Sequence, residues 1–536
     1  MNSHSLLKSS TVMAIGTIVS RVTGLIRGLL LVAVLGTTLL GDTYNVANTM
    51  PNILYNLLIG GALTAVFVPQ IVRATNSADG GSAFISKLVT ATCVFLGSLV
   101  LIAVVIAPIL VRLFATSYIG RPEFHVTTLF MRYCLPQIFF MGLFALLSQI
   151  ANAKNKFGPM MWAPVLNNVI AIVVFGWYFH VATKPTVATI STSEIIWLGL
   201  GTTFGYVAQA LILIPVIART NIKIRPRFDW RDPELRKSLH LASWTVLFAA
   251  ISQVSYLITV NLSTGAAVKA LKSGVETGVG FTPYNNALLI FMLPHSIITI
   301  SVVTALLPAL AKFVHEKKVN EVHDQLVKAM RLVGVITVPS AIFFLFFGPL
   351  ITKTLFFGIS RNDGNYLGYV LCAFALGLIP MSLNLIALRG LNAFENVKLQ
   401  VLSNGLMNLV GAIASVSVAM ALPAKWVTVG LAGALSLSYY VGAFLTVRLL
   451  RRYGISIALG EVAGFYSKLV ALSLIPALPL WLLENHLPGG NTLRLVIVLG
   501  IGGFGYLLVS KIFAVEEITN ILEILPLGKL TNRRAK

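Results

Sequence analysis

Residues 88–110 read LVTATCVFLGSLVLIAVVIAPIL and contain no charged side chain. At 1.5 Å per residue, a helix of about 20 apolar residues crosses the ~30 Å hydrocarbon core of a lipid bilayer. Apolar stretches of similar length recur from one end of the chain to the other. This recurrence predicts an all-α integral membrane protein that crosses the bilayer many times.

The composition supports the same fold class. Of the 536 residues, 57% are hydrophobic and 11% are charged, and the mean hydropathy is +0.86. A soluble domain carries roughly 25% charged residues because its surface faces water. The three cysteines, Cys93, Cys134 and Cys372, lie apart within apolar stretches. Their spacing matches neither a zinc site nor a disulfide framework, so we interpret them as small apolar residues.

Fourteen membrane spans are expected, with boundaries good to a few residues. They cover residues 11–38, 45–72, 84–114, 125–151, 160–181, 194–218, 239–262, 283–311, 327–357, 366–390, 400–421, 426–448, 460–484 and 492–514. Pro51, Pro108, Pro136, Pro294 and Pro339 are expected kink sites within them.

The positive charge predicts how the chain is oriented. The net charge of +22 is spread over short loops, which argues against a nucleic-acid partner and for contact with membrane lipids. The side of the membrane that holds the N-terminus carries about 27 Lys and Arg, against about 9 on the other side. An even number of spans then places both termini in the cytoplasm.

The two halves of the chain resemble each other. Residues 150–153 read IANA and residues 390–393 read GLNA, 240 positions later. Pro69 and Pro308 correspond at an offset of 239, and residues 19–23 and 251–255 at 232. The repeat predicts two pseudo-symmetric six-helix lobes, residues 1–220 and 221–452, with parallel topology. Residues 453–536 then add two C-terminal helices and a basic tail.

Two arginines inside the first span are the main candidate site. Arg21 and Arg27 are six residues apart, hence 240° apart around a regular helix. Gly24 lies between them and could let the helix bend or unwind. Such residues normally face a wet cavity or a partner, although either arginine could instead extend to the membrane interface. In the repeat they correspond to Gln253 and Thr259, so we expect a cationic cavity in one lobe. Its guest would be an anion such as a diphosphate, which suits the planar guanidinium.

The motifs around this site resemble those of the MurJ (MviN) family of lipid II flippases, in the multidrug/oligosaccharidyl-lipid/polysaccharide exporter superfamily. Residues 20–27 read SRVTGLIR, which matches the family pattern S-R-x-x-G-x-x-R. Further matches are GDT at 41–43, MPNIL at 50–54, GAL at 61–63, FVP at 67–69, NAKNKF at 152–157, APVLNN at 163–168 and LLP at 306–308.

The resemblance implies a transporter that is not an enzyme and moves lipid II from the cytoplasmic to the periplasmic leaflet of the bacterial inner membrane. Alternating access of the two lobes would expose a central cavity, while the undecaprenyl tail stays in a lateral groove. It implies diphosphate binding by Arg21 and Arg27, with Ser20 and Gly24 in the same motif. It also gives Asp42 a gating role near the periplasmic end. Cell-wall synthesis proteins are further expected partners.

The sequence departs from the family pattern at several positions. Many members have an arginine where this chain has Tyr55, an arginine in the span over 283–311 that is missing here, and an acidic residue where Gly28 stands. This pattern resembles the actinobacterial branch. Asn52 and Tyr55 could supply neutral donors to the substrate, or could serve the packing of their span.

Three other polar residues lie inside spans. His295 follows Pro294 and is either a cavity donor or a core histidine with a hydrogen-bond partner. Asn404 and Asn408 are four residues apart and share a helix face. They form either interhelical hydrogen bonds or a cation site.

The sequence contains no phosphate-binding loop, metal-ligand cluster or catalytic triad. We therefore expect no cofactor, and transport driven by membrane potential or an ion gradient. Two alternatives stay open: export of another undecaprenyl-diphosphate-linked saccharide, and a scaffold for envelope enzymes that transports nothing.

Overall fold

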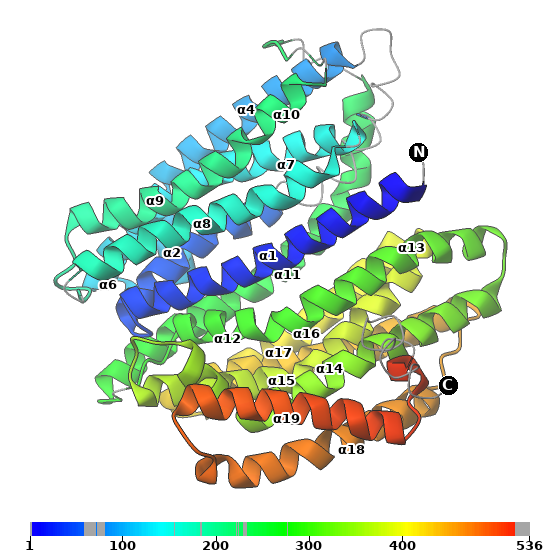
Figure 1. Ribbon diagram of the computed structural model, residues 1–536. Coiled ribbons are helices and arrows are strands. Elements are labelled where there is room, and N and C mark those ends of the chain that lie inside the picture. Colours follow the sequence, from blue (N-terminus) through cyan, green and yellow to red (C-terminus); the bar gives the residue numbers. More distant parts are fainter. Residues whose placement is uncertain are drawn as a thin grey trace. The chain divides into compact units, whose positions relative to one another are not determined.

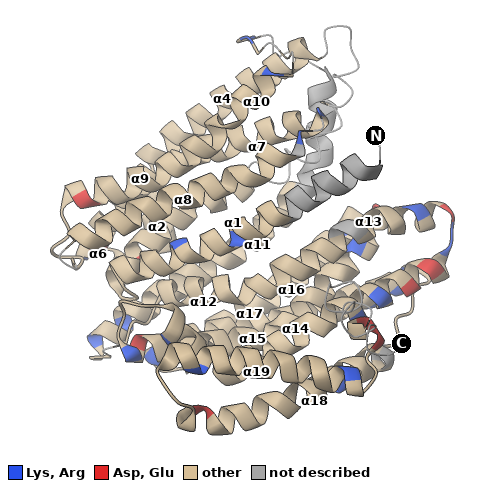
Figure 2. Ribbon diagram, viewed as in Figure 1, with Lys and Arg blue, Asp and Glu red and all other residues tan. Residues whose placement is uncertain are grey.

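The computed structural model describes residues 3–57, 71, 81–154, 156–182, 185–220, 222, 224–228, 233–275 and 277–519. Within these ranges every regular element is a helix (Figure 1). Thirteen of the helices described are long and apolar enough to cross a membrane. The charged residues of the described chain gather mainly near helix ends and loops (Figure 2). The predicted all-α, multi-pass membrane fold is confirmed.

The chain divides into two units, each described here by itself. The first contains residues 1–285 and 422–428, and the second contains residues 286–421 and 429–536. The helices of the first unit are α1 (Ser3–Leu35), α2 (Leu39–Tyr55), α4 (Ser82–Val105), α5 (Ala107–Phe114), α6 (Pro122–Cys134), α7 (Gln137–Ala153), α8 (Phe157–Val181), α9 (Thr192–Leu211), α10 (Leu213–Ala218), α11 (Pro233–Lys272) and the start of α12 (Phe281–Pro294). Within this unit α1 packs along α8 (Figure 1).

Two of the expected proline positions interrupt helices of the first unit. Pro108 lies at the start of α5, directly after α4 has ended, and Pro136 is the N-cap of α7, directly after α6. A proline removes a backbone donor and crowds the preceding turn, so the helix ends there and a new one begins. The stretches predicted as single spans over 84–114 and 125–151 are therefore each built from two helices.

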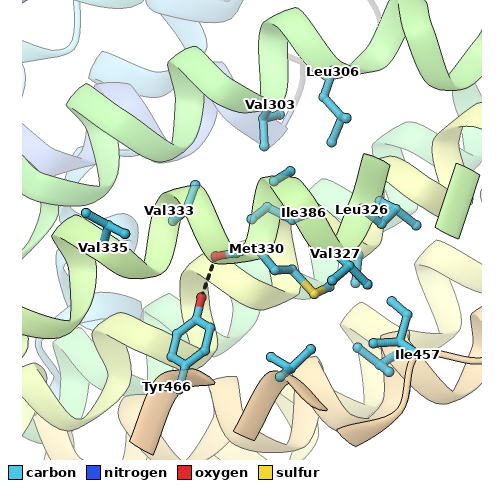
Figure 3. Packing of buried hydrophobic residues seen from close by; sticks show 14 of the residues in the cluster. Val303, Leu306, Leu326, Val327, Met330, Val333, Val335, Ile386, Ile457 and Tyr466 are labelled. Atoms are coloured by element: carbon cyan, nitrogen blue, oxygen red, sulfur yellow. Dashed lines mark hydrogen bonds between the residues drawn. The ribbon is translucent and has the colours of Figure 1, made fainter. Parts of the chain in front are cut away.

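The second unit continues α12 through a π-helical turn, η4 (His295–Thr299). It then contains α13 (Ile300–His315), α14 (Val319–Leu355), α15 (Arg361–Ala393), α16 (Val397–Ala421), α17 (Ala424–Leu450) from residue 429 on, α18 (Leu459–Leu483) and α19 (Asn491–Ile512). Its core contains Val303, Leu326, Met330 and Ile386 (Figure 3). Tyr466 of α18 lies in this core, and its hydroxyl donates to the Met330 carbonyl at 2.8 Å (Figure 3). This bond satisfies a polar group that would otherwise be buried alone.

The number of spans and the lobe boundaries stay predictions. The expected span over 45–72 begins within α2 and continues into residues outside the described ranges. The basic tail also lies outside the described ranges. The two units above reflect packing in this conformation, whereas the lobes 1–220 and 221–452 were predicted from sequence repetition.

Candidate functional site

The two arginines of α1 lie on the part of the helix that is open. Arg21 is exposed and Arg27 is half-buried, and their neighbour Val22 is 50% exposed. The C-terminal end of α1 is closed, since Val32 is 0% exposed and Leu35 is 4% exposed. Side-chain accessibility in α1 thus falls steeply from the arginines toward Leu35.

Asn168 of α8 holds the backbone of α1 beside the arginines. Its Nδ2 donates to the Ser20 carbonyl at 3.0 Å and to the Thr23 hydroxyl at 3.1 Å. A Cβ on Gly24 would lie 3.5 Å from the same nitrogen, so α1 approaches α8 closely here. The α1 helix continues through Gly24, and the unwinding considered from the sequence does not occur in this conformation. Arg21 and Arg27 therefore keep the 240° separation of a regular helix.

A polar stripe runs along α2. Its members are Asp42, Asn45, Asn52 and Tyr55, which recur at helical spacing and share one side of the helix. Asp42 and Asn45 are buried, whereas Asn52 and Tyr55 are half-buried. The polar stripe is therefore sealed at the N-terminal end of α2 and accessible toward its C-terminal end. Since consecutive spans run in opposite directions, the sealed ends of α1 and α2 lie at the same side of the membrane.

The Asp42 carboxylate caps the first turn of α12. Its Oδ2 accepts from the Phe281 N–H at 3.0 Å, and its Oδ1 accepts from the Thr282 N–H at 2.6 Å. These amides belong to the first turn of a helix, where no backbone carbonyl is available to them. The carboxylate also opposes the positive end of the helix dipole. Asp42 thereby bonds α2 to α12 in a fully buried contact.

Asn45 and Gly280 complete this contact. Asn45 lies three residues after Asp42, and its Nδ2 donates to the Thr282 hydroxyl at 3.0 Å. Gly280 precedes α12 with a φ of +143°, and a Cβ at this position would collide with Asp42 Oδ2. Glycine is therefore required both by the backbone conformation and by the close approach of the carboxylate. Sequence reasoning did not identify these residues, since no family motif quoted above includes them.

The contact joins residues that the repeat treats as equivalent. Asp42 and Thr282 are 240 positions apart, close to the offset of 239 between Pro69 and Pro308. The contact therefore joins positions that correspond, to within one residue, in the two copies of the predicted repeat.

His295 lies in the second unit, in the π-helical turn after Pro294. It is buried, and its Nδ1 lies 3.0 Å from the Ser382 hydroxyl of α15. Thr299, at the end of the same turn, donates to Ser382 at 3.2 Å. A π-helical turn inserts an extra residue into the helix and often marks a functional position.

Asn404 and Asn408 bond to each other within α16. Asn408 Nδ2 donates to the Asn404 backbone carbonyl at 2.8 Å and to its Oδ1 at 3.0 Å. Asn404 is buried and Asn408 is half-buried. Within the residues described, no three His, Cys, Asp or Glu side chains gather as a metal site.

Arg389 of α15 is a basic residue that the sequence reading did not single out. It is half-buried, and its Nε has no hydrogen-bond partner among the residues that the structure describes. It lies seven residues after Ser382, two helical turns along the same face of α15. Its place near the end of the predicted span over 366–390 could have identified it, because ionisable residues inside spans are expensive and often functional.

An apolar cavity of about 440 Å³ lies in the second unit, chiefly between α14 and α19. Its lining includes Pro339 and Phe343 of α14, and Gly503 and Leu507 of α19. Because α19 follows the predicted repeat, the cavity is built partly from the second of the two additional C-terminal helices.

Comparison with known proteins shows the family of the chain. The family model "Lipid II flippase MurJ" matches residues 31–499. A probable lipid II flippase MurJ from Vibrio cholerae serotype O1 is 25% identical over 529 residues, which cover 94% of each chain. Another from Buchnera aphidicola subsp. Baizongia pistaciae is 25% identical over 515 residues, covering 94% of this chain and 96% of that one.

Solved structures share the fold. A structure described as "Lipid II flippase MurJ, inward closed conformation" superposes with a TM-score of 0.74 at 21% identity, covering 94% of this chain and 98% of that one. An inward-facing multidrug resistance MATE family transporter of the MOP superfamily gives a TM-score of 0.63 at 14% identity, over 82% and 96% of the two chains. Because the family model covers most of the sequence, the chain belongs to the lipid II flippase MurJ family, whose members are transporters and not enzymes.

Proposed function

We propose that this protein translocates lipid II from the cytoplasmic to the periplasmic leaflet by alternating access around Arg21 and Arg27. Membership of the MurJ family supports the substrate class. The observation that carries the mechanism is the accessibility of α1, which is open beside its two arginines and closed at its C-terminal end. This arrangement suits a binding chamber that opens to the cytoplasm.

The diphosphate of the substrate binds the arginines in this proposal. Each guanidinium offers paired N–H donors that match phosphate oxygens, and charge-assisted bonds are about twice as strong as neutral ones. Asn168 fixes the backbone at Ser20 and Thr23, so the arginines project from a helix that is held in place. Asn52 and Tyr55 supply neutral donors on the accessible part of the polar stripe.

The Asp42 contact keeps the periplasmic end closed. Opening would require the carboxylate to leave the Phe281 and Thr282 amides. Substrate can drive that step only if it binds the two conformations with different affinities. Water that enters the opened contact would solvate both the carboxylate and the amides, and so offset the lost bonds.

The polyprenyl chain occupies the apolar cavity between α14 and α19. The cavity is lined by hydrocarbon and aromatic side chains, which suit an isoprenoid and would repel a sugar. The sugars and the peptide remain with the diphosphate in the polar chamber.

The protein lies in the bacterial cytoplasmic membrane with both termini in the cytoplasm. Its transport is driven by the membrane potential or an ion gradient, because each elementary charge moved across 100 mV contributes about 2.3 kcal/mol. This orientation places the accessible parts of α1 and α2 toward the compartment where lipid II is made.

Transport of a fluorescent lipid II by purified protein in proteoliposomes tests the proposal. Arg21→Ala and Arg27→Ala should each reduce the rate roughly 10- to 100-fold, because each loses charge-assisted bonds to the diphosphate. Arg27→Lys should give an intermediate rate, since it keeps the charge and loses the planar fork. Arg132→Ala is the matched control, because Arg132 is an exposed arginine near the end of another membrane helix.

Normal transport by both alanine variants would refute the assignment of Arg21 and Arg27 as the diphosphate-binding site. If the wild-type protein moves a different undecaprenyl-diphosphate-linked saccharide faster than lipid II, that saccharide becomes the proposed substrate. A wild-type protein that moves neither would favour the scaffold alternative.

A further inference from the structure

The loop that follows α10 is attached to α4 in a defined register. Its residues 224–228, named here the α4 strap, have no regular secondary structure. The Arg225 N–H donates to the Ser86 hydroxyl at 3.1 Å, and the Arg227 N–H donates to the Thr90 hydroxyl at 3.0 Å. The two hydroxyls are one helical turn apart on α4, about 6 Å along its axis. Amides two residues apart in an extended chain have nearly the same spacing, about 6.6 Å.

Proline fits this register. Pro226 lies between the two bonded amides and has no N–H of its own, so the strap leaves no donor unsatisfied at that position. Ser86 and Thr90 are both buried, which shows that the strap covers this part of α4. The attachment is thus built from the backbone amides of Arg225 and Arg227, and it does not use their guanidinium groups.

The strap has one basic face and one apolar face. In an extended chain, alternate side chains point to opposite faces, so Arg225 and Arg227 share one face. Ile224, Pro226 and Phe228 share the other. Both arginines are exposed, Ile224 is 39% exposed and Phe228 is 66% exposed. Among the described residues neither arginine forms an ion pair.

The position of the strap corresponds to the edge of the bilayer. Ser86 and Thr90 belong to the first two turns of α4, which is one of the helices able to cross the membrane. A segment bonded there lies within about 12 Å of the helix end, the depth of lipid headgroups and the upper acyl chains. Exposed Ile and Phe side chains favour that boundary region.

The surroundings are also basic. Arg219, at the end of α10, and Lys156, in the loop after α7, are exposed at the same end of the unit. The stretches 81–90, 150–160 and 213–228 contain no Asp or Glu. Arg219 and Lys156 therefore add to the positive charge of Arg225 and Arg227, and the acidic residues that flank these stretches in the sequence are Asp79 and Asp229.

We propose that the α4 strap is a binding site for an anionic phospholipid of the cytoplasmic leaflet. Arg225 and Arg227 bind the phosphate of the headgroup, while Ile224 and Phe228 lie among the upper acyl chains. An acidic protein segment would satisfy the arginines but would leave the apolar face without a partner. The attachment to α4 fixes the spacing of the two arginines. The strap should therefore bind a phosphate headgroup more specifically than basic residues on an unattached loop would.

Native mass spectrometry of the full-length protein, titrated with phosphatidylglycerol or phosphatidylcholine in neutral detergent, tests this site. Wild type should bind phosphatidylglycerol in preference to phosphatidylcholine. Arg225→Gln with Arg227→Gln should weaken the first phosphatidylglycerol site roughly 30-fold, the loss expected for two basic residues near an anionic surface. Ser86→Ala with Thr90→Val keeps both charges and releases the strap, and should give a smaller, several-fold loss.

Arg451→Gln with Arg452→Gln is the matched control. It removes the same charge from η5 (Arg451–Tyr453), an exposed 3₁₀ turn of the second unit, and should leave the first phosphatidylglycerol site unchanged. Thermal unfolding in detergent verifies that each variant is folded. The proposal is overturned if Arg225→Gln with Arg227→Gln binds phosphatidylglycerol as tightly as wild type. It is also overturned if the Arg451 and Arg452 control loses as much affinity, or if wild type binds phosphatidylglycerol and phosphatidylcholine equally. The measurement uses no lipid II, so its outcome is independent of the proposed transport function.

Discussion

Asp42 shows how one buried carboxylate can join two helices through backbone amides, with no ion pair to any residue that the structure describes. Its two oxygens accept from two consecutive amides at the start of α12, and Gly280, directly before these amides, leaves room for the carboxylate because it has no Cβ. Hydrogen bonds to an ionised group contribute more than neutral ones, and an unsatisfied buried donor costs about 1–3 kcal/mol. The contact should therefore be sensitive to very small changes at either partner.

Asp42→Asn is expected to loosen the start of α12. An asparagine side chain has one acceptor oxygen, and its NH₂ group would face an N–H donor. Amide hydrogen exchange, followed by mass spectrometry, should become roughly 10-fold faster in a peptide covering residues 278–285. Gly280→Ala should speed exchange in the same peptide, because the added Cβ would displace the Asp42 carboxylate from the amides.

Gly265→Ala serves as the control for this prediction. Gly265 lies on α11 in the same unit, and a Cβ there has no atom within 4 Å. Exchange at 278–285 should stay as in wild type. If Asp42→Asn exchanges no faster than this control, Asp42 does not hold the end of α12.

At the scale of whole elements, the α12–η4–α13 segment is built differently from the single span expected over 283–311. The segment remains helical from Phe281 to His315, but a π-helical turn begins directly after Pro294. Proline cannot donate to the preceding turn, and the extra residue of the π-turn accommodates that loss. The proline was visible in the sequence, whereas the contacts of the turn were not, because Ser382 of α15, which bonds both His295 and Thr299, lies more than 80 residues away.

The cavity between α14 and α19 gives a prediction about the lipid tail. Gly503 lines it, and a Cβ at Gly503 has no atom within 4 Å. Gly503→Leu should therefore fold normally and fill part of the space proposed for the polyprenyl chain. Lipid II transport in proteoliposomes should fall several-fold, with a smaller effect on a substrate that carries a short prenyl chain.

Gly500→Leu provides the comparison. Gly500 is exposed on the same helix, and a Cβ there also meets no neighbour within 4 Å. The same side chain is thus added outside the cavity. Equal transport by the two variants would argue against the tail site, whatever the absolute rates.

At the scale of the whole molecule, the distribution of basic residues predicts the orientation in the membrane. The three native cysteines can be replaced by alanine to give a background without thiols, since none forms a disulfide. Ala188→Cys, in the loop between α8 and α9, should react with a membrane-impermeant maleimide in intact spheroplasts. Arg452→Cys, in the loop after α17, should react only after the membrane is permeabilised. The reverse pattern would invert the topology and place the α1 arginines toward the periplasm.

The sequence by itself determined the fold class and the family. Long apolar stretches can satisfy their backbone groups in a bilayer only as helices or closed barrels, and their length here requires helices. The motif around Arg21 and Arg27 is local, because its residues are neighbours in one helix. It could therefore be recognised without any knowledge of packing. The family that it suggested is the one whose model matches residues 31–499, which begin after the motif.

Only the tertiary structure decided which polar groups meet. Asp42 and Thr282 are 240 residues apart, and nothing in either segment specifies that a carboxylate will cap that helix. The same holds for Asn168 and Ser20, and for the α4 strap, whose register depends on two hydroxyls far away in the sequence. Hydropathy encodes burial along each helix, whereas hydrogen bonds between helices depend on distances that arise only when the helices pack.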